Sequence, residues 1–560
     1  MEEQVQTPNN VRSKKPLIAV LAIVVLLGIA GYLLLARGPS ADPAGYLPKE
    51  VALAATVDLT SSADKDAAVS VIRGIFKDAG VAKPEQELYK EINKELKLDF
   101  EKDVLSHLTG RGAFATLTEM NGMMPMMVAV IGAKSEGDAE TLMKTFSEKL
   151  GENRIGFQKL SYKGCDYIRI QGETPSTGMP FGRPQVVNYV GAVKSAVVWA
   201  NSDGGFKKVV DTAKGEPSLL KDPEFARLRQ TDPATFATLF VSGPGYYKLV
   251  SPMMNMSMGM MSGEVPPELK EQMENVVAVV CTADANGEGL KFKAVGLTKK
   301  PRTQTESLPL DELAAEFPAD AKIALGFKSF DKAWGEIKKS VLSNAAVKGQ
   351  VSQMTAQAKQ MMGFDPITDL LDHFTSLSAY YVPRKGANSS AFPGAVTVVI
   401  GTDKSDVVKA SVNKLQAFAA LSGKMKVSKA SASGQEFSVL PISPNGDKLG
   451  NVVLGDKVIV AISGSDIVQA MSSAIAVVQG NGEKLTDSPG YKLVKSQLPD
   501  KSVGLIYGDI GGIMNVFADD IPEPDGKKVK AVFKRVGWFG AAGESQGTES
   551  TSVTFVPFEK

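Results

Sequence analysis

The chain has 560 residues, of which 43% are hydrophobic and 22% are charged, a composition that is ordinary for a folded globular protein. Its 63 Lys and Arg residues nearly balance its 62 Asp and Glu residues. This balance excludes the basic field that nucleic-acid binding requires, so we expect no nucleic-acid partner. The length is sufficient for two or more domains.

The first predicted element is an uncharged run of 20 residues, LIAVLAIVVLLGIAGYLLLA, at residues 17–36. A helix of about 20 apolar residues spans the roughly 30 Å hydrocarbon core of a bilayer. Arg12, Lys14 and Lys15 stand just before the run, and positive residues beside a first span usually stay in the cytoplasm. The run therefore predicts a transmembrane anchor with its N-terminus in the cytoplasm.

This reading divides the N-terminal part into a cytoplasmic tail at residues 1–16, the anchor at 17–36 and a juxtamembrane linker at 37–43. The remaining body is then extracytoplasmic, and the chain is a single-pass protein of the cell membrane. The alternative is a cleaved secretory signal, for which Ser40 and Ala41 form a weak cleavage site.

The body that follows contains the same series of sequence segments twice, in the same order. The segment LPKEVALAATVDL, from Leu47, is matched by FPADAKIALGFKS, from Phe317, and several later segments match with nearly the same offset. Chance matches would not keep both their order and their spacing. We therefore predict two homologous domains at residues 44–300 and 308–560, joined by a polar linker at 301–307.

Each copy has the pattern of an α+β domain. In the first copy, apolar residues at 65–78 have the spacing of one helix face and predict a helix there. Ser135 can cap a second helix. Strands are predicted at residues 51–59, 110–117, 126–133, 165–170, 186–193, 195–201, 275–285 and 290–298. The short turns between them predict antiparallel pairing. The predicted fold class is thus α+β, with an N-terminal transmembrane helix followed by two tandem homologous domains of mainly antiparallel sheets and packed helices.

Taken together, these features resemble the DUF3352 family of uncharacterised bacterial proteins. The features are the anchor, a first strand introduced by LP or FP and an acidic residue, the DPEF helix start at residues 222–225, and the duplicated body. The resemblance covers most of residues 44–560. It implies a bacterial cell-envelope protein, and it supplies no catalytic residues.

The two histidines of the chain, His107 and His373, hold equivalent places in the two copies. Each ends a short helical pattern, and each follows an Asp by four residues. Because a His near a helix C-terminus is favoured by the helix dipole, we expect both to be structural.

The remaining chemical motifs are weak. The run GESQG at residues 543–547 fits G-x-S-x-G, but no His follows it and its surroundings read as a hairpin, so we reject a nucleophile elbow. No phosphate loop, dinucleotide fingerprint or H-E-x-x-H pattern occurs. We therefore predict no catalytic residue, no cofactor and no metal site. Cys165 and Cys281 lie in predicted strands and are interpreted as buried thiols, with a disulfide between them left open.

Methionine is the most unusual feature, with 21 residues that gather at 120–127, 253–261 and 354–362. Three interpretations stay open: apolar packing or a mobile loop, an apolar or peptide-binding surface, and a Cu(I) site. The matching place in the second copy has only Met514, so the middle group is an addition to the first copy. We predict that it is partly exposed and mobile, and that it contacts an apolar, lipid or peptide partner. This predicted surface comprises Met253, Met254, Met256, Met258, Met260 and Met261.

These observations predict a non-catalytic binding, scaffold or chaperone-like module of the bacterial cell envelope. The alternatives are an envelope hydrolase that uses carboxylates and a methionine-based Cu(I)-binding protein.

Overall fold

The structure is a computed structural model. It describes residues 42–58, 89–90, 93, 98–122, 124–152, 155–171, 187–230, 235–259, 267–286, 288–301, 306–343, 345–384, 394–421, 426–443, 446–464, 466–517 and 537–557. Within these ranges, no helix combines the length and the apolar composition that crossing a bilayer needs. The predicted anchor at 17–36 and the predicted helix at 65–78 lie outside the described residues, so both stay predictions.

The described residues fall into two compact units, one with residues 42–58 and 89–241 and the other with residues 242–557. Both units mix helices with antiparallel strands, which confirms the predicted α+β class at this level. Each unit is described by itself below.

The first unit contains a run of strands joined edge to edge in the order β4-β5-β6-β7-β3-β2-β1-β8, with each neighbouring pair antiparallel. The strands are β1 (Val51–Asp58), β2 (Leu108–Asn121), β3 (Met124–Ala133), β4 (Phe157–Tyr162), β5 (Cys165–Gln171), β6 (Val187–Val193), β7 (Ala196–Ala200) and β8 (Ala237–Ser242). The pairs β2–β3, β4–β5 and β6–β7 are joined by short turns, as the sequence predicts.

The α-helices of this unit are α4 (Phe100–Asp103), α5 (Glu136–Glu152), α6 (Asp203–Ala213) and α7 (Pro223–Gln230). Its 3-10 turns are η1 (Pro43–Gly45), η2 (Leu105–His107) and η3 (Leu219–Lys221). Helix α5 begins where Ser135 predicts, because the Ser135 hydroxyl accepts a hydrogen bond from the Asp138 backbone N–H at 3.1 Å. Its buried side chains, Leu142 and Leu150 among them, pack against the strands.

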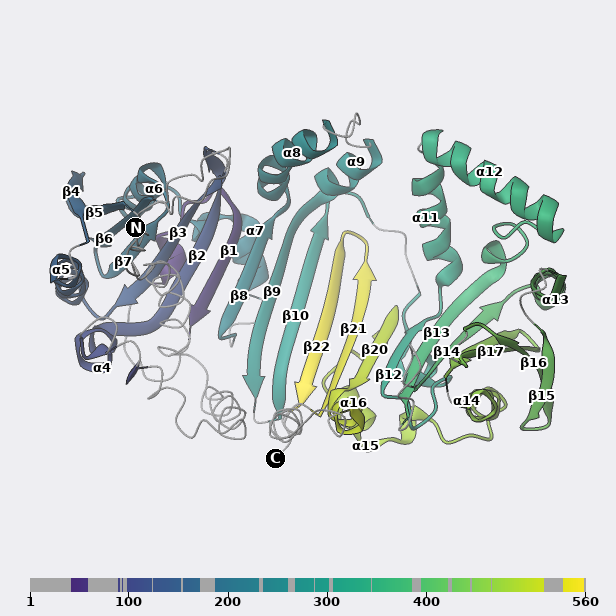
Figure 1. The fold of residues 1–560 in the computed structure, drawn as a ribbon. Helices are drawn as coiled ribbons and strands as arrows, with labels where there is room; N and C mark the ends of the chain where they lie inside the picture. The colour runs from purple at the N-terminus through teal and green to yellow at the C-terminus, as the bar shows by residue number, and fades with distance from the viewer. Residues whose placement is uncertain are drawn as a thin grey trace, which may run out of the picture. The chain divides into compact units, whose positions relative to one another are not determined.

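The second unit contains a longer antiparallel run, in the order β9-β10-β22-β21-β20-β12-β13-β14-β18-β17-β16-β15 (Figure 1). The strands are β9 (Val276–Asn286), β10 (Gly289–Thr298), β12 (Ile323–Phe327), β13 (Phe374–Pro383), β14 (Gly394–Thr402), β15 (Ser428–Ala432), β16 (Gln435–Pro441), β17 (Lys448–Leu454), β18 (Lys457–Ser463), β20 (Gly504–Asp509), β21 (Trp538–Gln546) and β22 (Glu549–Pro557). Strands β11 (Leu308–Pro309) and β19 (Lys501–Ser502) form a separate short pair.

The hydrophobic core of this unit lies on one side of its sheet. It contains large side chains with almost no exposure, such as Phe317, Tyr491 and Phe555, and it is covered by α10, α14 and α15. The helices are α8 (Gly243–Gly259), α9 (Pro267–Asn275), α10 (Leu310–Ala314), α11 (Phe330–Ser343), α12 (Ala345–Met362), α13 (Ser405–Leu421), α14 (Ile467–Val478), α15 (Pro489–Lys495) and α16 (Ile510–Phe517). The 3-10 turns are η4 (Leu371–His373) and η5 (Leu485–Asp487).

The two runs of strands share one order. In the first unit the spatial order is β4-β5-β6-β7-β3-β2-β1-β8, and in the second it is β15-β16-β17-β18-β14-β13-β12-β20. Strands at the same position in these two lists also have the same rank along the chain within their list. The compact units nevertheless divide at residues 241 and 242, because β10, expected near the end of the first copy, pairs with β22. The predicted domain limits at 44–300 and 308–560 stay a prediction about the sequence repeat.

Candidate functional site

A row of directly paired residues crosses the sheet of the second unit. It runs from Phe292 on β10 through Thr554, Ala541 and Ile506 to Leu325 on β12. Residues that face each other in neighbouring antiparallel strands project from the same side of the sheet, and the pattern repeats every second residue along each strand. The register therefore defines three successive rows on one face of these five strands.

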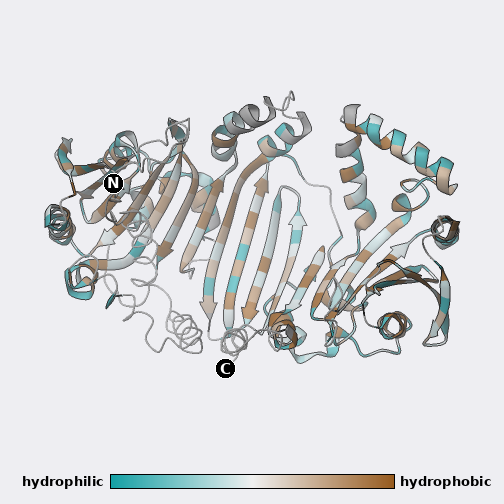
Figure 2. Cartoon of the chain, in the orientation of Figure 1, coloured by the Kyte–Doolittle hydropathy of each residue, from teal (hydrophilic) through white to brown (hydrophobic). Residues whose placement is uncertain are grey.

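We call this surface the uncharged face, because none of its fifteen positions carries an ionisable side chain. Its members are Leu290, Phe292 and Ala294 on β10; Ser552, Thr554 and Val556 on β22; Phe539, Ala541 and Gly543 on β21; Gly504, Ile506 and Gly508 on β20; and Ile323, Leu325 and Phe327 on β12. The hydrophobic core lies on the opposite side. Along β10, hydrophilic and hydrophobic residues alternate (Figure 2), since Lys291 and Lys293 point away from this face.

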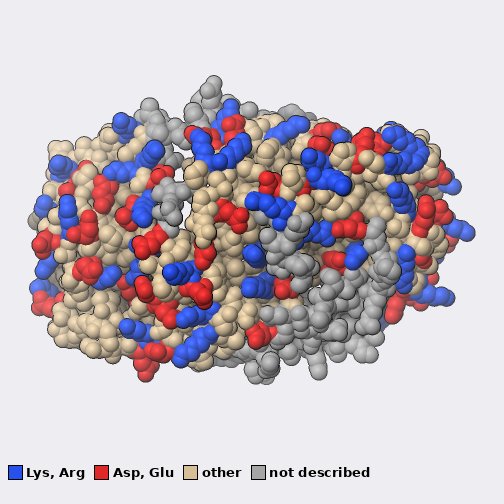
Figure 3. All heavy atoms as spheres, turned by 180° about the vertical axis from the view of Figure 1, so that it is seen from behind, with Lys and Arg blue, Asp and Glu red and all other residues tan. Residues whose placement is uncertain are grey.

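Large apolar side chains on this face stay exposed to solvent. The exposed fractions are 42% for Phe292, 38% for Ile323, 39% for Phe327 and 37% for Ile506. Single exposed apolar residues are normal on a protein surface, whereas four of them on one uncharged face make this surface the candidate binding site. On the side of the structure shown in Figure 3, acidic and basic side chains are interspersed over the described residues.

Two glycines leave room for aromatic rings on the uncharged face. A Cβ on Gly508 would lie 1.9 Å from the Phe539 ring, and a Cβ on Gly504 would lie 2.7 Å from the Phe327 ring. Because no side chain could occupy these places, the rings cover the β20 backbone, and Ile506 stands between them. The sequence pattern shows neither feature, since both depend on the pairing of β20 with β12 and β21.

The chemistry of this face is that of binding. Acid–base catalysis needs a titratable group within hydrogen-bond reach of the reacting atoms, and these fifteen positions supply only the hydroxyls of Ser552 and Thr554. The surface can exclude water from an apolar ligand and can stabilise it by contact.

The predicted methionine surface can be placed only in part. Met253, Met254, Met256 and Met258 lie in α8, which contacts β9 and α9, and their side chains are not described. Met260 and Met261 lie outside the described residues. The proposed contact role of these residues therefore stays a prediction.

The other methionine groups belong to elements with defined partners. Met120, Met124, Met126 and Met127 lie in the hairpin of β2 and β3. Met354 and Met361 on α12 are 68% and 64% exposed. No group of three or more His, Cys, Asp or Glu that could hold a metal occurs in the described ranges.

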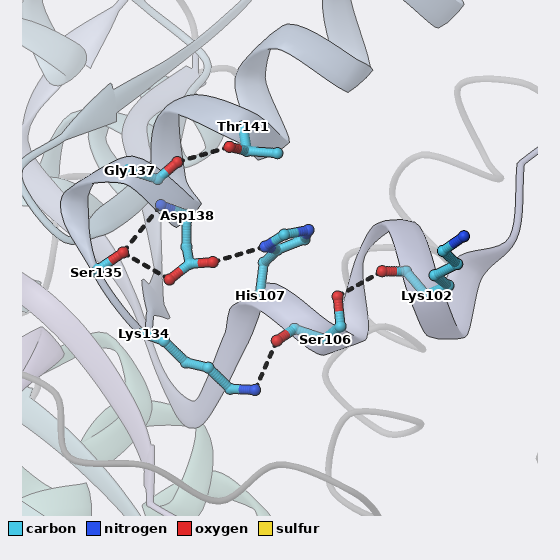
Figure 4. Close-up of polar contacts among 8 residues, drawn as sticks. All are labelled: Lys102, Ser106, His107, Lys134, Ser135, Gly137, Asp138 and Thr141. Atoms are coloured by element: carbon cyan, nitrogen blue, oxygen red, sulfur yellow. Dashed lines mark hydrogen bonds and ion pairs between the residues drawn. The ribbon is translucent and has the colours of Figure 1, made fainter.

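His107 joins the end of η2 to the start of α5 (Figure 4). Its Nδ1 lies 2.6 Å from Asp138 Oδ1, and the other oxygen of Asp138 accepts a hydrogen bond from the Ser135 hydroxyl at 2.6 Å. The hydrogen bonds from His107 and then Ser135 hold the pKa of Asp138 below its usual range.

His373 makes the same kind of contact in the second unit, where its Nδ1 lies 3.1 Å from Asp403 Oδ1 ahead of α13. The Asp four residues before each His also has a local role. Asp103 accepts the Asp99 backbone N–H, and Asp369 accepts the Asp365 backbone N–H, each at 2.9 Å. Asp103 and Asp369 therefore have a structural role near His107 and His373, which explains why an Asp occurs four residues before each His.

A buried ionic cluster in the second unit escaped the sequence analysis. Glu316 is only 8% exposed, and its Oε1 lies 2.6 Å from Lys328 Nζ and 2.9 Å from Lys457 Nζ. Its Oε2 accepts a hydrogen bond from the Ser378 hydroxyl at 2.6 Å. Burial raises the pKa of Glu316, but the Lys328 charge and these hydrogen bonds outweigh burial and hold it below its ordinary value.

The remaining motif residues have no catalytic arrangement. Cys165 and Cys281 are unpaired and half-buried, and burial raises the pKa of the Cys281 thiol. Ser545 lies near the end of β21, where a turn leads into β22 rather than into a helix. A nucleophile elbow requires the helix, so its predicted absence agrees with the local structure.

The comparison with protein families decides the identity of the chain. The model of DUF3352, described as a protein of unknown function, matches residues 17–556. The chain belongs to the DUF3352 family. The match confirms the resemblance seen in the sequence, and it begins at the first residue of the apolar run.

This DUF3352 protein has no match among the curated proteins. Among solved structures it is similar to crystal forms I, III and IV of TP0453. The identity is 9–10%, the matches cover 46–47% of this chain and 81–83% of the TP0453 chain, and the TM-scores are 0.24–0.26. At these TM-scores the likeness carries no argument about function.

Proposed function

We propose that this DUF3352 protein is a membrane-anchored, extracytoplasmic module of the bacterial cell envelope that binds an apolar ligand on the uncharged face. The observation that carries the proposal is the exposure of Phe292, Ile323, Phe327 and Ile506 on a surface without ionisable groups. A scaffold or chaperone-like role would use the same surface, because binding an apolar ligand by contact needs no catalytic residue.

The energetics favour a ligand of moderate affinity. Full burial of one large apolar side chain contributes about 1.5–3 kcal/mol, and these side chains have roughly two fifths of their area left to bury. Four such contacts therefore contribute a few kcal/mol in all. Part of this offsets the lost freedom of the ligand.

The binding proposal is tested with the uncharged fluorescent probe N-phenyl-1-naphthylamine. We expect the full chain to bind the probe and Ile506→Lys to lose this binding, since a charge would be desolvated beside the ligand. Leu239→Lys on β8 is the matched control, because Leu239 is also 37% exposed and holds the corresponding place in the first unit. Unchanged binding in Ile506→Lys, or equal loss in Leu239→Lys, would overturn the proposed site.

The location is tested separately by protease protection. The apolar run at residues 17–36 and the positive residues before it support an extracytoplasmic body. We expect protease added to intact spheroplasts to degrade the body. Protection of the body in intact spheroplasts, with degradation only after lysis, would contradict this topology.

A further inference from the structure

The backbone beneath the uncharged face restricts what can bind there. Each of β10, β22, β21, β20 and β12 pairs with a strand on both sides, so their ladders use the backbone groups within the sheet. An extended peptide laid on this face would bury its own N–H and C=O groups without backbone partners, which is unfavourable for each group. A hydrocarbon chain has no such groups.

Small residues form a lane along the two middle strands of this face. In one row, Thr554 and Ala541 lie between Phe292 and Ile506. In the next row, Ser552, Gly543 and Gly504 lie between Ala294 and Phe327. Neighbouring strands are about 4.8 Å apart, so roughly 14 Å separates the β10 and β20 backbones that border the lane.

The two ends of the lane differ in chemistry. One end is closed by Val556 and Phe539, whose ring lies on Gly508. At the other end, Ser550 pairs with Ser545, so hydroxyls replace apolar groups. The lane is therefore apolar at its closed end and polar but uncharged at its open end.

The dimensions suit one acyl chain. Six residue steps separate Ser550 from Val556 on β22, which at about 3.3 Å each span roughly 20 Å. An acyl chain fills one leaflet, about half of the roughly 30 Å hydrocarbon core. One chain thus lies lengthwise within the lane, and its polar end reaches the hydroxyls.

The open end of the lane favours an ester over a free carboxylate. Gly296, Ser550 and Ser545, which share this face at the open end, carry no charge, and the neighbouring Glu544 and Glu549 project from the opposite side of the sheet. A fatty-acid carboxylate would lose water there without a cationic partner, whereas the ester linkage of a glycerolipid carries no charge.

We propose that the lane along β21 and β22 binds one acyl chain of a glycerolipid, with the terminal methyl against Val556 and Phe539 and the ester beside Ser545 and Ser550. This proposal rests on the proposed function, because it names the ligand class of the same face.

The test is photo-crosslinking in vesicles. The full chain is reconstituted in phosphatidylcholine vesicles containing a phosphatidylcholine with a diazirine at the end of one acyl chain, and crosslinked peptides are mapped by mass spectrometry. We expect adducts on β20, β21 and β22. Ser552→Trp should reduce them about tenfold, the change expected when roughly two methylene groups lose their contact.

Matched controls keep the result interpretable. Ser552 and Ser431 are both exposed strand serines of the same unit, so Ser431→Trp should fold equally well and should keep the adducts. Loss of adducts in both variants would overturn the assignment to the lane. Labelling by a diazirine fatty acid or a diazirine peptide, without labelling by the glycerolipid, would overturn the ligand class.

The naphthylamine experiment separates the two proposals. If Ile506→Lys abolishes probe binding but the glycerolipid forms no adducts in the lane, the acyl-chain proposal fails and the proposed function stands. If the wild-type chain binds neither the probe nor the lipid, both fail.

Discussion

The same row of paired residues occurs in both units, but different side chains fill it. In the first unit it runs from Leu239 through Ala55 to Phe114, and in the second from Ile506 through Leu325 to Ala379. The backbone pairing is alike, so the difference lies in the side chains. Strand β1 presents Leu53, Ala55 and Val57, all partly buried, where β12 presents Ile323, Leu325 and Phe327, two of them exposed.

This comparison teaches that one arrangement of strands can carry an apolar row that is mostly partly buried or one that is more exposed. We propose that the two copies arose by duplication, since their strands pair in the same order. In the second unit the row also continues onto β21, β22 and β10, which extends the uncharged face. The following predictions test how far the two units differ.

The largest expected effect comes from removing a buried carboxylate in the second unit, compared with a partly exposed one in the first. Glu316→Gln leaves Lys328 and Lys457 largely buried without their carboxylate, so we expect a loss of about 3–5 kcal/mol in the free energy of unfolding. Asp58 at the end of β1 pairs with Arg111 at 2.9 Å but is partly exposed, and Asp58→Asn should cost about 1 kcal/mol or less. Urea unfolding measures both.

An exposed pair provides the reference for this measurement. Lys429 and Glu436 form an ion pair in which both side chains are more than half exposed, and Glu436→Gln should change stability little. A Glu316→Gln variant as stable as Glu436→Gln would show that the cluster has no structural role.

A smaller effect is expected at Gly508, which faces Ile323 as Val241 faces Leu53 in the first unit. Gly508→Ala forces the Phe539 ring away from β20, and overpacking of this kind costs about 1–3 kcal/mol. Gly335→Ala on α11 is the control, since its Cβ would enter open space and alanine favours the helix. Thermal unfolding that ranks Gly335→Ala as the less stable variant would contradict the close packing of Phe539.

The smallest effect separates the two His–Asp pairs. His107→Ala should cost about 1 kcal/mol, and His373→Ala should cost less because its distance of 3.1 Å is longer and Asp403 is more exposed. The hydrogen bond from His107 lowers the pKa of Asp138. The pair therefore contributes stability above the unfolded carboxyl pKa of about 4 and loses it as the pH falls through the lower folded pKa.

Unfolding measured between pH 2 and pH 6, a range set by the carboxyl pKa values near 4, checks this sign. His107→Ala should flatten the acid limb of the stability curve, since Asp138 would then titrate more as it does in the unfolded chain. An unchanged acid limb would show that other carboxylates govern it.

Local patterns determined most of the secondary structure of this DUF3352 protein. Strand β1 follows from the alternation at residues 51–59, and α5 begins at the cap supplied by Ser135. These features depend on residues within a few positions of each other, so backbone preference and side-chain periodicity are enough to predict them. The family resemblance rested on the apolar run, on short motifs and on the repeat of those motifs along the chain.

Only the tertiary structure decided which distant side chains meet. Glu316 contacts Lys328 12 residues away and Ser378 62 residues away, and no local pattern marks such a set. The uncharged face likewise depends on β10, β22 and β20 lying in one sheet, because the register decides which side every second residue takes. A strand sequence specifies the alternation of its side chains, whereas its partners decide whether the apolar side forms a core or stays open to a ligand.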